Sequence, residues 1–420
     1  MDKLIIRGGG ALRLRGEVRM SGAKNAVLPS IAASLLTAGE IRLTNVPRVK
    51  DVQTILTLIA DLGGTAKATG DSVSLRVPKI RSDEASYELV RAMRASILVL
   101  GPLLARFGKA VVALPGGCAI GSRPIDLHIA GLQKLGARIE LEHGYIRAEA
   151  DRLRGAEITF DKKTVTGTEN LLMAAALAKG ETVLRNCARE PEVADLAVLL
   201  NKMGAKIDWP DADTARVRGV KELGGAAHAI IPDRIETGTF LVAGALTAGD
   251  MLVRGVVPEH VGSVIDKLRV AGAYVEPEGE GALRVVGRRE VRAQDITTLP
   301  YPGFPTDMQA QFMVLQTQAE GTSIVTETIF DRRFSHVNEL VRLGAVIEVQ
   351  GDKAVIKGRT PLSGAEVVAT DLRASAALVL AGLIASGETT ITEIDHLDRG
   401  YERIEEKLGA LGASIERVKS

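Results

Sequence analysis

The stretch "DVQTILTLIADLGG", residues 51–64, joins an amphipathic helix to a glycine pair, and the same junction returns throughout the chain. Val52, Ile55 and Ile59 follow the 3.6-residue period of a helix that buries one face. A glycine followed by glycine or alanine comes after such a helix six times, 68 to 73 residues apart, at Gly63, Gly136, Gly204, Gly272, Gly344 and Gly412. A period that accounts for the whole chain indicates a repeat architecture.

Each repeat also contains an earlier glycine, where a first helix ends and a strand begins. These glycines are Gly39, Gly108, Gly180, Gly249, Gly321 and Gly387. We expect each to adopt the left-handed conformation that glycine favours at a helix end. The repeat closes with two strands, as in "AVIEVQGDKAVIKG" at 345–358, where Gly351 and Asp352 predict a hairpin turn. The sequence therefore predicts an α/β fold of six helix-strand-helix-strand-strand repeats.

The last repeat lacks its closing strand, and the beginning of the chain matches the missing piece. Residues 2–25 follow the pattern of residues 352–375, so we predict that residues 1–20 pair with the final repeat. Six repeats divide into three and three. The predicted domains are a continuous one, residues 21–231, and a discontinuous one made of residues 1–20 and 232–420. An active site is expected between them, where ligand sites commonly lie.

Composition excludes several classes of function. Basic residues number 53 and acidic residues 52, so no overall positive field attracts nucleic acid. Apolar runs such as "ILVLGPLLA" are too short to cross a membrane, and the first residues show no signal-peptide core, so we expect a cytoplasmic protein without membrane insertion. Two cysteines are too few for a disulfide framework. Metal-ligand spacings and phosphate loops are missing as well, so we expect no cofactor and no metal.

The repeats place charged or polar side chains at equivalent helix starts. For the first helix these are Lys24 with Asn25, Arg94, Lys163, Asp233 with Arg234, Asp307, and Asp371 with Arg373; for the second they are Arg123, Glu190, Arg333 and Arg399. Helix N-termini attract anions, and neighbouring lysine or arginine strengthens the attraction. We therefore expect an anion-binding cleft, and for each single side chain the alternative is a solvated helix cap.

The loop "LPGGCAIGSRPID", residues 114–126, lengthens the second repeat. The strand-opening glycine precedes the glycine-alanine junction by 28 residues there and by 23 to 25 in the other five repeats. Cys118 lies in this extra segment with Arg123 nearby, a setting that favours a reactive thiolate, so we interpret it as functional. Cys187 is interpreted as an inert, buried cysteine.

Six segments resemble the UDP-N-acetylglucosamine 1-carboxyvinyltransferases, a family of enolpyruvyl transferases. They are "SGAKNAVLPSIAASLL", "LPGGCAIGSRPIDLHIAGL", "PDRIETGTFL", "GFPTDMQAQF", "TDLRASAALVLAG" and "DRGYERIE". The resemblance implies a two-domain inside-out α/β barrel with three repeats per domain. It also implies that phosphoenolpyruvate and UDP-N-acetylglucosamine are the substrates. The enolpyruvyl group moves to the sugar 3′-hydroxyl with release of phosphate, in the first committed step of peptidoglycan synthesis.

The resemblance also implies a role for each candidate residue. Cys118 donates the proton to the enol carbon and is the target of fosfomycin, and Asp307 is the base at the sugar hydroxyl. Lys24, Arg123 and Arg399 hold phosphoenolpyruvate, with Arg94 and Arg373 nearby, and Lys24 and Arg399 belong with Cys118 and Asp307 to the catalytic set. The sugar nucleotide is expected to contact Asn25, Pro124, Ile125, Asp126, Leu127, Lys163, Thr166, Gly167 and Ile329.

Three rival functions follow from the same residues. A shikimate 3-phosphate enolpyruvyl transferase shares the fold but lacks the cysteine loop. A cysteine hydrolase requires a histidine base, for which His128 is the nearest candidate in sequence, without any hydrolase signature around it. A catalytically silent protein that binds nucleotide sugars remains the alternative outside enzymology, and the presence of both Cys118 and Asp307 argues against it. The sequence leaves the oligomeric state open.

Overall fold

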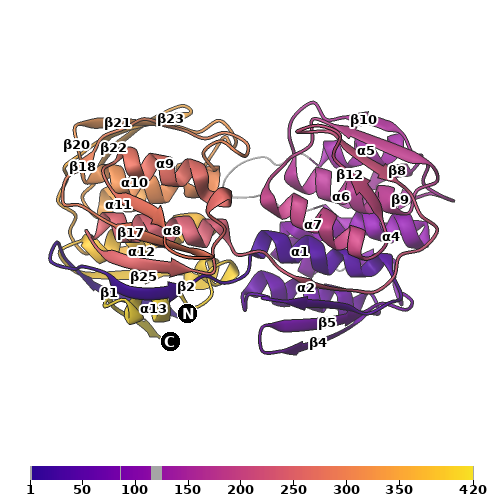
Figure 1. The fold of residues 1–420 in the computed structure, drawn as a ribbon, viewed down its shortest axis with the longest axis horizontal. Helices are drawn as coiled ribbons and strands as arrows, with labels where there is room; N and C mark the ends of the chain where they lie inside the picture. Colours follow the sequence, from indigo (N-terminus) through magenta and orange to yellow (C-terminus); the bar gives the residue numbers. More distant parts are fainter. Residues whose placement is uncertain (1, 86, 115–124, 420) are drawn as a thin grey trace. The chain divides into compact units, whose positions relative to one another are not determined.

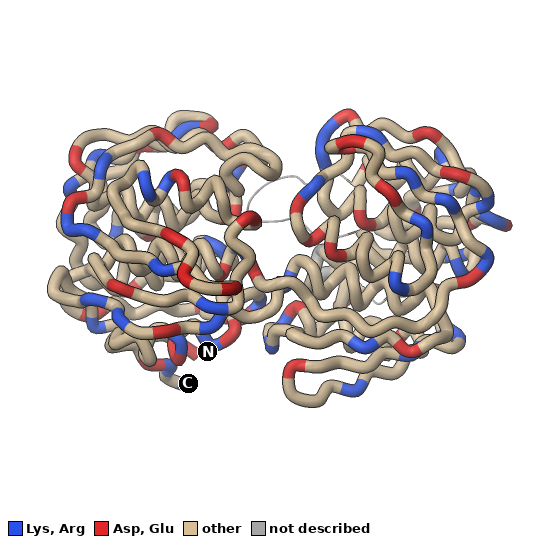
Figure 2. Tube along the Cα trace, in the orientation of Figure 1, with Lys and Arg blue, Asp and Glu red and all other residues tan. Residues whose placement is uncertain are grey.

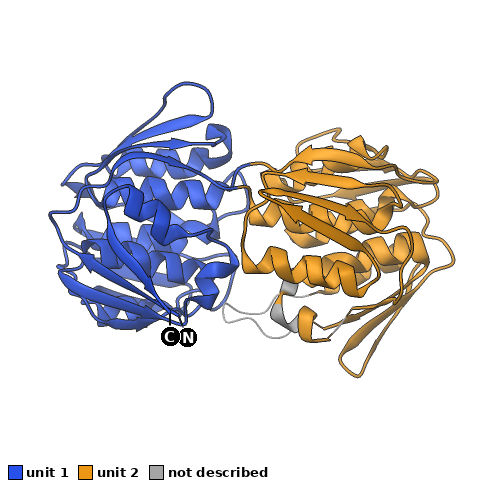
Figure 3. Ribbon diagram, turned by 90° about the horizontal axis from the view of Figure 1, so that it is seen from below, with its two compact units in different colours: residues 1–21, 118–122, 232–420 blue, residues 22–117, 123–231 orange. Residues whose placement is uncertain are grey.

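The computed structural model describes residues 2–85, 87–114 and 125–419. The described residues form two compact units, shown in blue and orange in Figure 3. Unit 1 contains residues 2–21 and 232–419, and unit 2 contains residues 22–114 and 125–231. The chain therefore passes from one unit to the other after Ser21 and again after Ile231.

Each unit contains three four-stranded sheets within the described residues. In unit 2 their strand orders are β14 (Ala226–Ala229), β3 (Ile41–Thr44), β5 (Ser72–Arg76) and β4 (Thr65–Thr69); β6 (Glu84–Ala85), β7 (Lys109–Ala113), β9 (Tyr145–Glu149) and β8 (Arg138–Glu142); and β10 (Glu157–Thr159), β11 (Glu181–Arg185), β13 (Ala215–Arg218) and β12 (Lys206–Asp208). In every sheet the last two strands form a hairpin, and the first strand is parallel to its neighbour.

The sheets of unit 1 repeat this order. They are β2 (Arg15–Arg19), β15 (Asp250–Arg254), β17 (Ala282–Val286) and β16 (Tyr274–Pro277); β19 (Ile296–Thr297), β21 (Thr322–Thr326), β23 (Lys353–Lys357) and β22 (Val346–Gln350); and β24 (Glu366–Val368), β25 (Gly387–Thr392), β1 (Lys3–Gly8) and β26 (Ser414–Val418). A short parallel pair, β18 (Val291–Arg292) and β20 (Ala319–Glu320), lies beside them. The predicted hairpin around Gly351 is confirmed as β22 and β23.

Helices fill the inside of each unit, and the sheets lie outside them (Figure 1). Unit 2 has α1 (Lys24–Ala32), α2 (Lys50–Asp61), α3 (Tyr87–Ala92), α4 (Leu100–Phe107), α5 (Asp126–Lys134), α6 (Val165–Ala176) and α7 (Pro191–Lys202), with 3₁₀ helices η1 (Ala33–Leu36) and η2 (Arg94–Val99). Unit 1 has α8 (Arg234–Leu246), α9 (Gly262–Val270), α10 (Gln309–Thr317), α11 (Val337–Arg342), α12 (Leu372–Ile384) and α13 (Ile404–Ala410), with η3 (Pro258–Val261), η4 (Thr306–Met308) and η5 (Ile394–Arg399).

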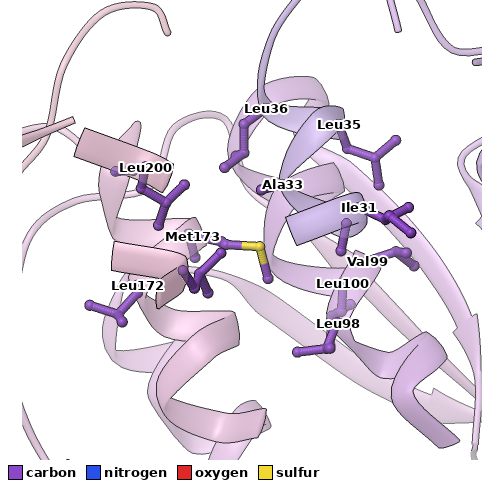
Figure 4. Close-up of a cluster of buried hydrophobic side chains, with 14 of the residues drawn as sticks. Ile31, Ala33, Leu35, Leu36, Leu98, Val99, Leu100, Leu172, Met173 and Leu200 are labelled. Carbon is purple, nitrogen blue, oxygen red and sulfur yellow. The ribbon is translucent and has the colours of Figure 1, made fainter. Parts of the chain in front are cut away.

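The first helix of a repeat is buried almost all round. Every residue of α8 from Ile235 to Leu246 is buried, whereas α2 buries only one face, which includes the predicted Val52, Ile55 and Ile59. Figure 4 shows Ile31, Leu98 and Met173 in the core of unit 2, where α1, η2 and α6 meet. This arrangement, with buried helices inside sheets, is the expected inside-out α/β barrel, and each unit has its own apolar core.

Six glycines mark the predicted repeat boundaries, and all have a positive φ. Their φ angles lie between 96° and 110° at Gly63, Gly136, Gly204, Gly272, Gly344 and Gly412. The left-handed conformation expected at the strand-opening glycines is present in four repeats, but the expectation is wrong at Gly39 and Gly249. At both glycines a neighbouring segment passes very close to the backbone. A Cβ on Gly39 would lie 2.3 Å from the backbone nitrogen of Gly225. A Cβ on Gly249 would lie 2.4 Å from the carbonyl oxygen of Leu14.

The predicted repeat has three strands, whereas the sheet of each observed repeat has four. The predicted pairing of residues 1–20 with the final repeat is correct for only one of their two strands. Strand β1 lies between β25 and β26 of the final repeat, as expected. Strand β2, however, pairs in parallel with β15 of the fourth repeat, and β14 likewise pairs with β3 of the first. Because the chain changes unit after β2 and after β14, each of these strands completes the first sheet of the unit that the chain is leaving.

Acidic and basic residues are interspersed over both units, as Figure 2 shows. Within the described ranges, no helix has the length and apolarity needed to span a bilayer.

Candidate active-site residues in the two units

Lys24 and Asn25 open α1 in unit 2. The Lys24 side chain is buried, and its Nζ lies 3.1 Å from Oδ2 of Asp51, which is buried in the first turn of α2. Among the residues that the structure describes, no side chain caps the N-terminus of α1, where Ala23 is the capping residue. The helix start therefore combines a cation and uncapped backbone amides, which is a suitable surface for an anion. Asp51 was not predicted, although it lies in the first turn of a second helix, where other repeats carry charged residues.

Other helix starts do not match the expectation of an anion site. Asp233 caps α8, accepting hydrogen bonds from the amides of Ile235 and Glu236, and Asp371 caps α12 in the same way. The Thr164 side chain caps α6 by accepting from Gly167. These side chains occupy first-turn amides that a bound anion would use. Asp233 and Asp371 are therefore helix caps, although Asp233 is buried and not solvated as the alternative expected, and at α6 the cap is Thr164 and not the predicted Lys163.

His128 lies at the centre of a hydrogen-bonded group in α5. Its Nδ1 is 3.0 Å from Nδ2 of Asn170, and its Nε2 is 3.2 Å from Oγ1 of Thr166. The Asn170 amide is oriented by its own contacts, since Oδ1 accepts from Gly101 and Nδ2 donates to Ile97. Nδ1 must then be the acceptor, so Nε2 carries the proton and donates to Thr166.

Burial lowers the pKa of His128 to about 4. The imidazole is therefore neutral near pH 7, and both ring nitrogens are engaged inside unit 2. A side chain in this state is poorly suited to activate a cysteine, which argues against the hydrolase alternative. Because the Thr166 hydroxyl accepts from Nε2, its own proton is available for donation.

The other described candidates of unit 2 lie at the starts of α6 and α5. Lys163 donates from Nζ to the carbonyl oxygen of Cys187 at 3.1 Å and to Oδ2 of Asp213 at 3.0 Å. Gly167 is buried in the first turn of α6. In α5, Asp126 is exposed, and Ile125 and Leu127, on either side of it, are half-buried.

Cys187 behaves as the inert cysteine that was predicted. It is fully buried, and its Sγ donates to the carbonyl oxygen of Leu184 at 3.3 Å. Burial raises the pKa of its thiol to about 11. The thiol is therefore neutral and inaccessible near pH 7.

Glu169 is a buried acid that sequence reasoning missed. Burial, together with the charges of Glu192 and Glu190, raises its pKa well above the usual value. Burial and the two neighbouring carboxylates thus favour the neutral form of this side chain. Among the residues the structure describes, acidic, histidine and cysteine side chains nowhere group as a metal site.

Asp307 is held between two arginines in unit 1. Its Oδ1 lies 2.8 Å from Nη2 of Arg333, and its Oδ2 lies 3.1 Å from Nε of Arg373. The two arginine side chains are 6% and 4% exposed, and that of Asp307 is 25% exposed. The structure therefore fixes a partly accessible carboxylate with two nearly buried cations.

Both arginines have further support. Arg333 donates from Nη1 to Oγ1 of Thr306, whose hydroxyl donates to Glu327. Arg373 lies over the ring of Tyr401, at 5.4 Å from its centre. Burial opposes the charged form of Arg373, but Asp307 and Tyr401 outweigh it and raise the pKa of this guanidinium above its usual value. The cluster is thus stabilised by contacts between residues that lie far apart in the sequence.

Two other predicted residues lie elsewhere in unit 1. Ile329 is half-buried, and its backbone amide donates to Oε1 of Glu327 at 2.8 Å. Arg399 is the last residue of η5 and is half-buried. Cys118, Arg123 and Pro124 lie outside the described residues, and Arg94 begins η2.

Comparisons with known proteins agree about the family. Residues 9–408 match the family of EPSP synthase (3-phosphoshikimate 1-carboxyvinyltransferase). The chain is 57% identical to the UDP-N-acetylglucosamine 1-carboxyvinyltransferase of Solibacter usitatus and 58% identical to that of Desulforapulum autotrophicum, with full coverage of both chains in each case. Among solved structures it resembles the enolpyruvyl transferase NikO from Streptomyces tendae, at a TM-score of 0.88 and 26% identity over 100% of this chain and 99% of that one. It also resembles EPSP synthase from Acinetobacter baumannii, at a TM-score of 0.78 and 19% identity over both whole chains.

Proposed function

This chain belongs to the UDP-N-acetylglucosamine 1-carboxyvinyltransferases, within the wider EPSP synthase family, and we propose that its substrates are phosphoenolpyruvate and UDP-N-acetylglucosamine. It transfers the enolpyruvyl group to the 3′-hydroxyl of the sugar with release of phosphate. Full-length identity of 57% to a relative of that name carries this conclusion. The EPSP synthase structure is only 19% identical and supports the fold alone, so shikimate 3-phosphate is the weaker choice of acceptor.

The reaction requires three proton transfers and the loss of an anion. A base takes the proton of the sugar hydroxyl as its oxygen bonds to the central enol carbon, and an acid gives a proton to the terminal carbon, which yields a tetrahedral intermediate that still bears phosphate. Phosphate then leaves, and the methyl group returns a proton as the double bond forms again. The enzyme must therefore supply a base, an acid and cations that bind the carboxylate and phosphate.

We assign the base to Asp307. A carboxylate can accept about four hydrogen bonds, and the side chain of Asp307 is 25% exposed, so we propose that a substrate hydroxyl donates to it. The two arginines fix its orientation from both oxygens. A base positioned in this way contributes a factor of about 10²–10⁴ to the rate.

We assign the acid to Cys118 and the anion contacts to Lys24, Arg123 and Arg399. The structure supports Lys24 through its place at an uncapped helix start. Its Nζ also pairs with Oδ2 of Asp51, and both side chains are buried. Arg94 and Arg373 are proposed to support the same anion, and Asn25 to contact the sugar.

The uridine diphosphate contacts are proposed to come mainly from unit 2. Thr166 is oriented by His128 to donate its hydroxyl proton, and Lys163 supplies a partly exposed cation beside it. We propose further contacts of the sugar nucleotide with Gly167, Pro124, Ile125, Asp126, Leu127 and Ile329. Both substrates are products of cytoplasmic metabolism, so we place the enzyme in the cytoplasm. Phosphoenolpyruvate itself supplies the transferred group, and the proposed chemistry uses no cofactor.

Product analysis tests the proposal. The purified protein is incubated with phosphoenolpyruvate and either UDP-N-acetylglucosamine or shikimate 3-phosphate, and the products are identified by mass spectrometry and proton NMR. We expect an enolpyruvyl ether at the sugar 3′-oxygen with the first acceptor only. An ether formed on shikimate 3-phosphate would overturn the choice of substrate, and binding of the nucleotide sugar without product would indicate the catalytically silent alternative.

A further inference from the structure

Arg417, near the C-terminal end of β26, makes a concentrated set of ion pairs. Its Nη1 and Nη2 lie 3.0 Å and 2.6 Å from the two carboxylate oxygens of Asp398, and its Nε lies 2.7 Å from Oε1 of Glu405. The side chains of Arg417 and Asp398 are each 21% exposed, and that of Glu405 is 12% exposed. A two-pronged arginine–carboxylate pair in this setting fixes geometry as well as charge.

The segment that Arg417 contacts has little regular structure of its own. Helix η5 is a single 3₁₀ helix of six residues, and 3₁₀ hydrogen bonds are poorer than those of an α-helix. The segment is bounded by Glu393 and Arg403, non-glycine residues with φ angles of 55° and 47°. Residues held in this conformation persist where surrounding contacts determine them. Side-chain anchors are therefore needed to define the path of residues 394–403.

Two anchors lie on either side of Arg399. Asp398, which directly precedes it, is bound by Arg417. Tyr401, two residues after it, is buried, and its hydroxyl lies 2.9 Å from Oγ1 of Thr239. The backbone of Arg399 is thus fixed on both sides by contacts to other elements of unit 1.

We propose that Arg417 is a positioning residue for Arg399, which it holds in place through Asp398 and Glu405 for contact with the anionic groups of phosphoenolpyruvate. The inference rests on the proposed role of Arg399 in the reaction. A displacement of about 1 Å in a positioned group can cost a hundredfold in rate. Arg417 itself contacts the carboxylates of Asp398, Glu405 and Asp2.

The test is Arg417→Lys, because lysine keeps the charge but cannot form the two-pronged pair. Arg284→Lys is the matched control. Arg284 pairs with both oxygens of Asp250, at 2.9 Å each, and with Glu278, on a sheet of the same unit. We expect Arg417→Lys to raise the KM for phosphoenolpyruvate about tenfold while the KM for UDP-N-acetylglucosamine stays within about twofold. Arg284→Lys should leave both unchanged.

A double-mutant cycle with Arg399→Lys separates this inference from the proposed function. If Arg417 acts through Arg399, adding Arg417→Lys to Arg399→Lys causes little further loss. Multiplicative effects of the two substitutions, or normal kinetics of Arg417→Lys, would overturn the positioning role. Normal kinetics of Arg399→Lys would instead overturn the assignment of Arg399. Asp398→Asn weakens the same pair from the other side, and it must show the same selective rise in KM even if Arg417→Lys does not fold.

Discussion

Replacement of Asp307 by asparagine separates its chemical role from its structural one. Asparagine has the shape of aspartate and keeps one acceptor oxygen, but it cannot take a proton from a hydroxyl near neutral pH. We expect kcat to fall by about 10²–10⁴, the usual contribution of a positioned base. At 1.36 kcal/mol per tenfold, this corresponds to about 2.7–5.4 kcal/mol of lost transition-state stabilisation.

The cost in stability follows from the two arginines. Alanine at position 307 would remove the carboxylate partner of Arg333 and of Arg373, whose side chains are only 6% and 4% exposed. Breaking a buried ion pair costs about 3–5 kcal/mol, and the 25% exposure of the Asp307 side chain places the expected loss near the lower end, about 3 kcal/mol. Asparagine retains a hydrogen-bond acceptor, so its expected cost is about 1–2 kcal/mol.

The assay combines urea unfolding with steady-state kinetics at a temperature where all variants are folded. Asp307→Ala and Asp307→Asn should differ in stability but lose kcat to a similar extent, with nucleotide affinity largely preserved. Asp250→Asn is the control, because it weakens an arginine pair in the same unit away from the cluster. An Asp307→Asn enzyme with kcat within tenfold of the wild type would refute the assignment of the base.

Three further predictions concern the cysteines and a buried histidine. Cys118→Ser should be nearly inactive, because a hydroxyl is too weak an acid. Cys118→Asp should retain activity with a more acidic pH optimum and should resist fosfomycin. An active serine variant or a drug-sensitive aspartate variant would contradict this prediction. Iodoacetamide should label one thiol in the native chain and two in urea, because burial raises the pKa of Cys187 to about 11 and fully covers it; labelling of Cys187 in the native protein would refute the prediction. The pKa of His128 is about 4 in the folded chain and about 6.5 when unfolded, so the unfolded state binds more protons between these values and the free energy of unfolding should decrease as pH falls from about 6.5 to 4. His128→Gln should remove this contribution, which totals on the order of 3 kcal/mol; identical pH slopes for the two proteins in urea titrations would show that His128 is not buried as a neutral side chain.

Local sequence predicted the repeat because a physical requirement imposes it in every copy. A helix that ends in a left-handed residue favours glycine, and all six marking glycines have that conformation. The fourth strand was missed because it is short, as in Glu84–Ala85, and carries no period of its own. Strands β2 and β14 each complete the sheet of a repeat that is distant in the sequence. This pairing depends on where the chain changes unit, and local sequence patterns do not encode that position.

The candidate residues were named one by one from the sequence, but the ion pairs that they form within the fold were not predicted. Asp307 and Arg373 were both named from the sequence, yet they are 66 residues apart, in η4 and α12, and only the tertiary fold brings them into an ion pair. The same holds for Lys24 and Asp51, which are 27 residues apart. The caps formed by Asp233 and Asp371 are local, and an aspartate before a helix is a common signal for a cap. This signal could have corrected the expectation of an anion site at the starts of α8 and α12.

Phosphate release tests the central claim most directly. The purified chain is given phosphoenolpyruvate alone, with UDP-N-acetylglucosamine, or with shikimate 3-phosphate, and inorganic phosphate is measured over time. We predict sustained release that requires UDP-N-acetylglucosamine and saturates with its concentration. Release that is equal without any acceptor, or that requires shikimate 3-phosphate instead, would contradict the assignment of this chain as a UDP-N-acetylglucosamine 1-carboxyvinyltransferase.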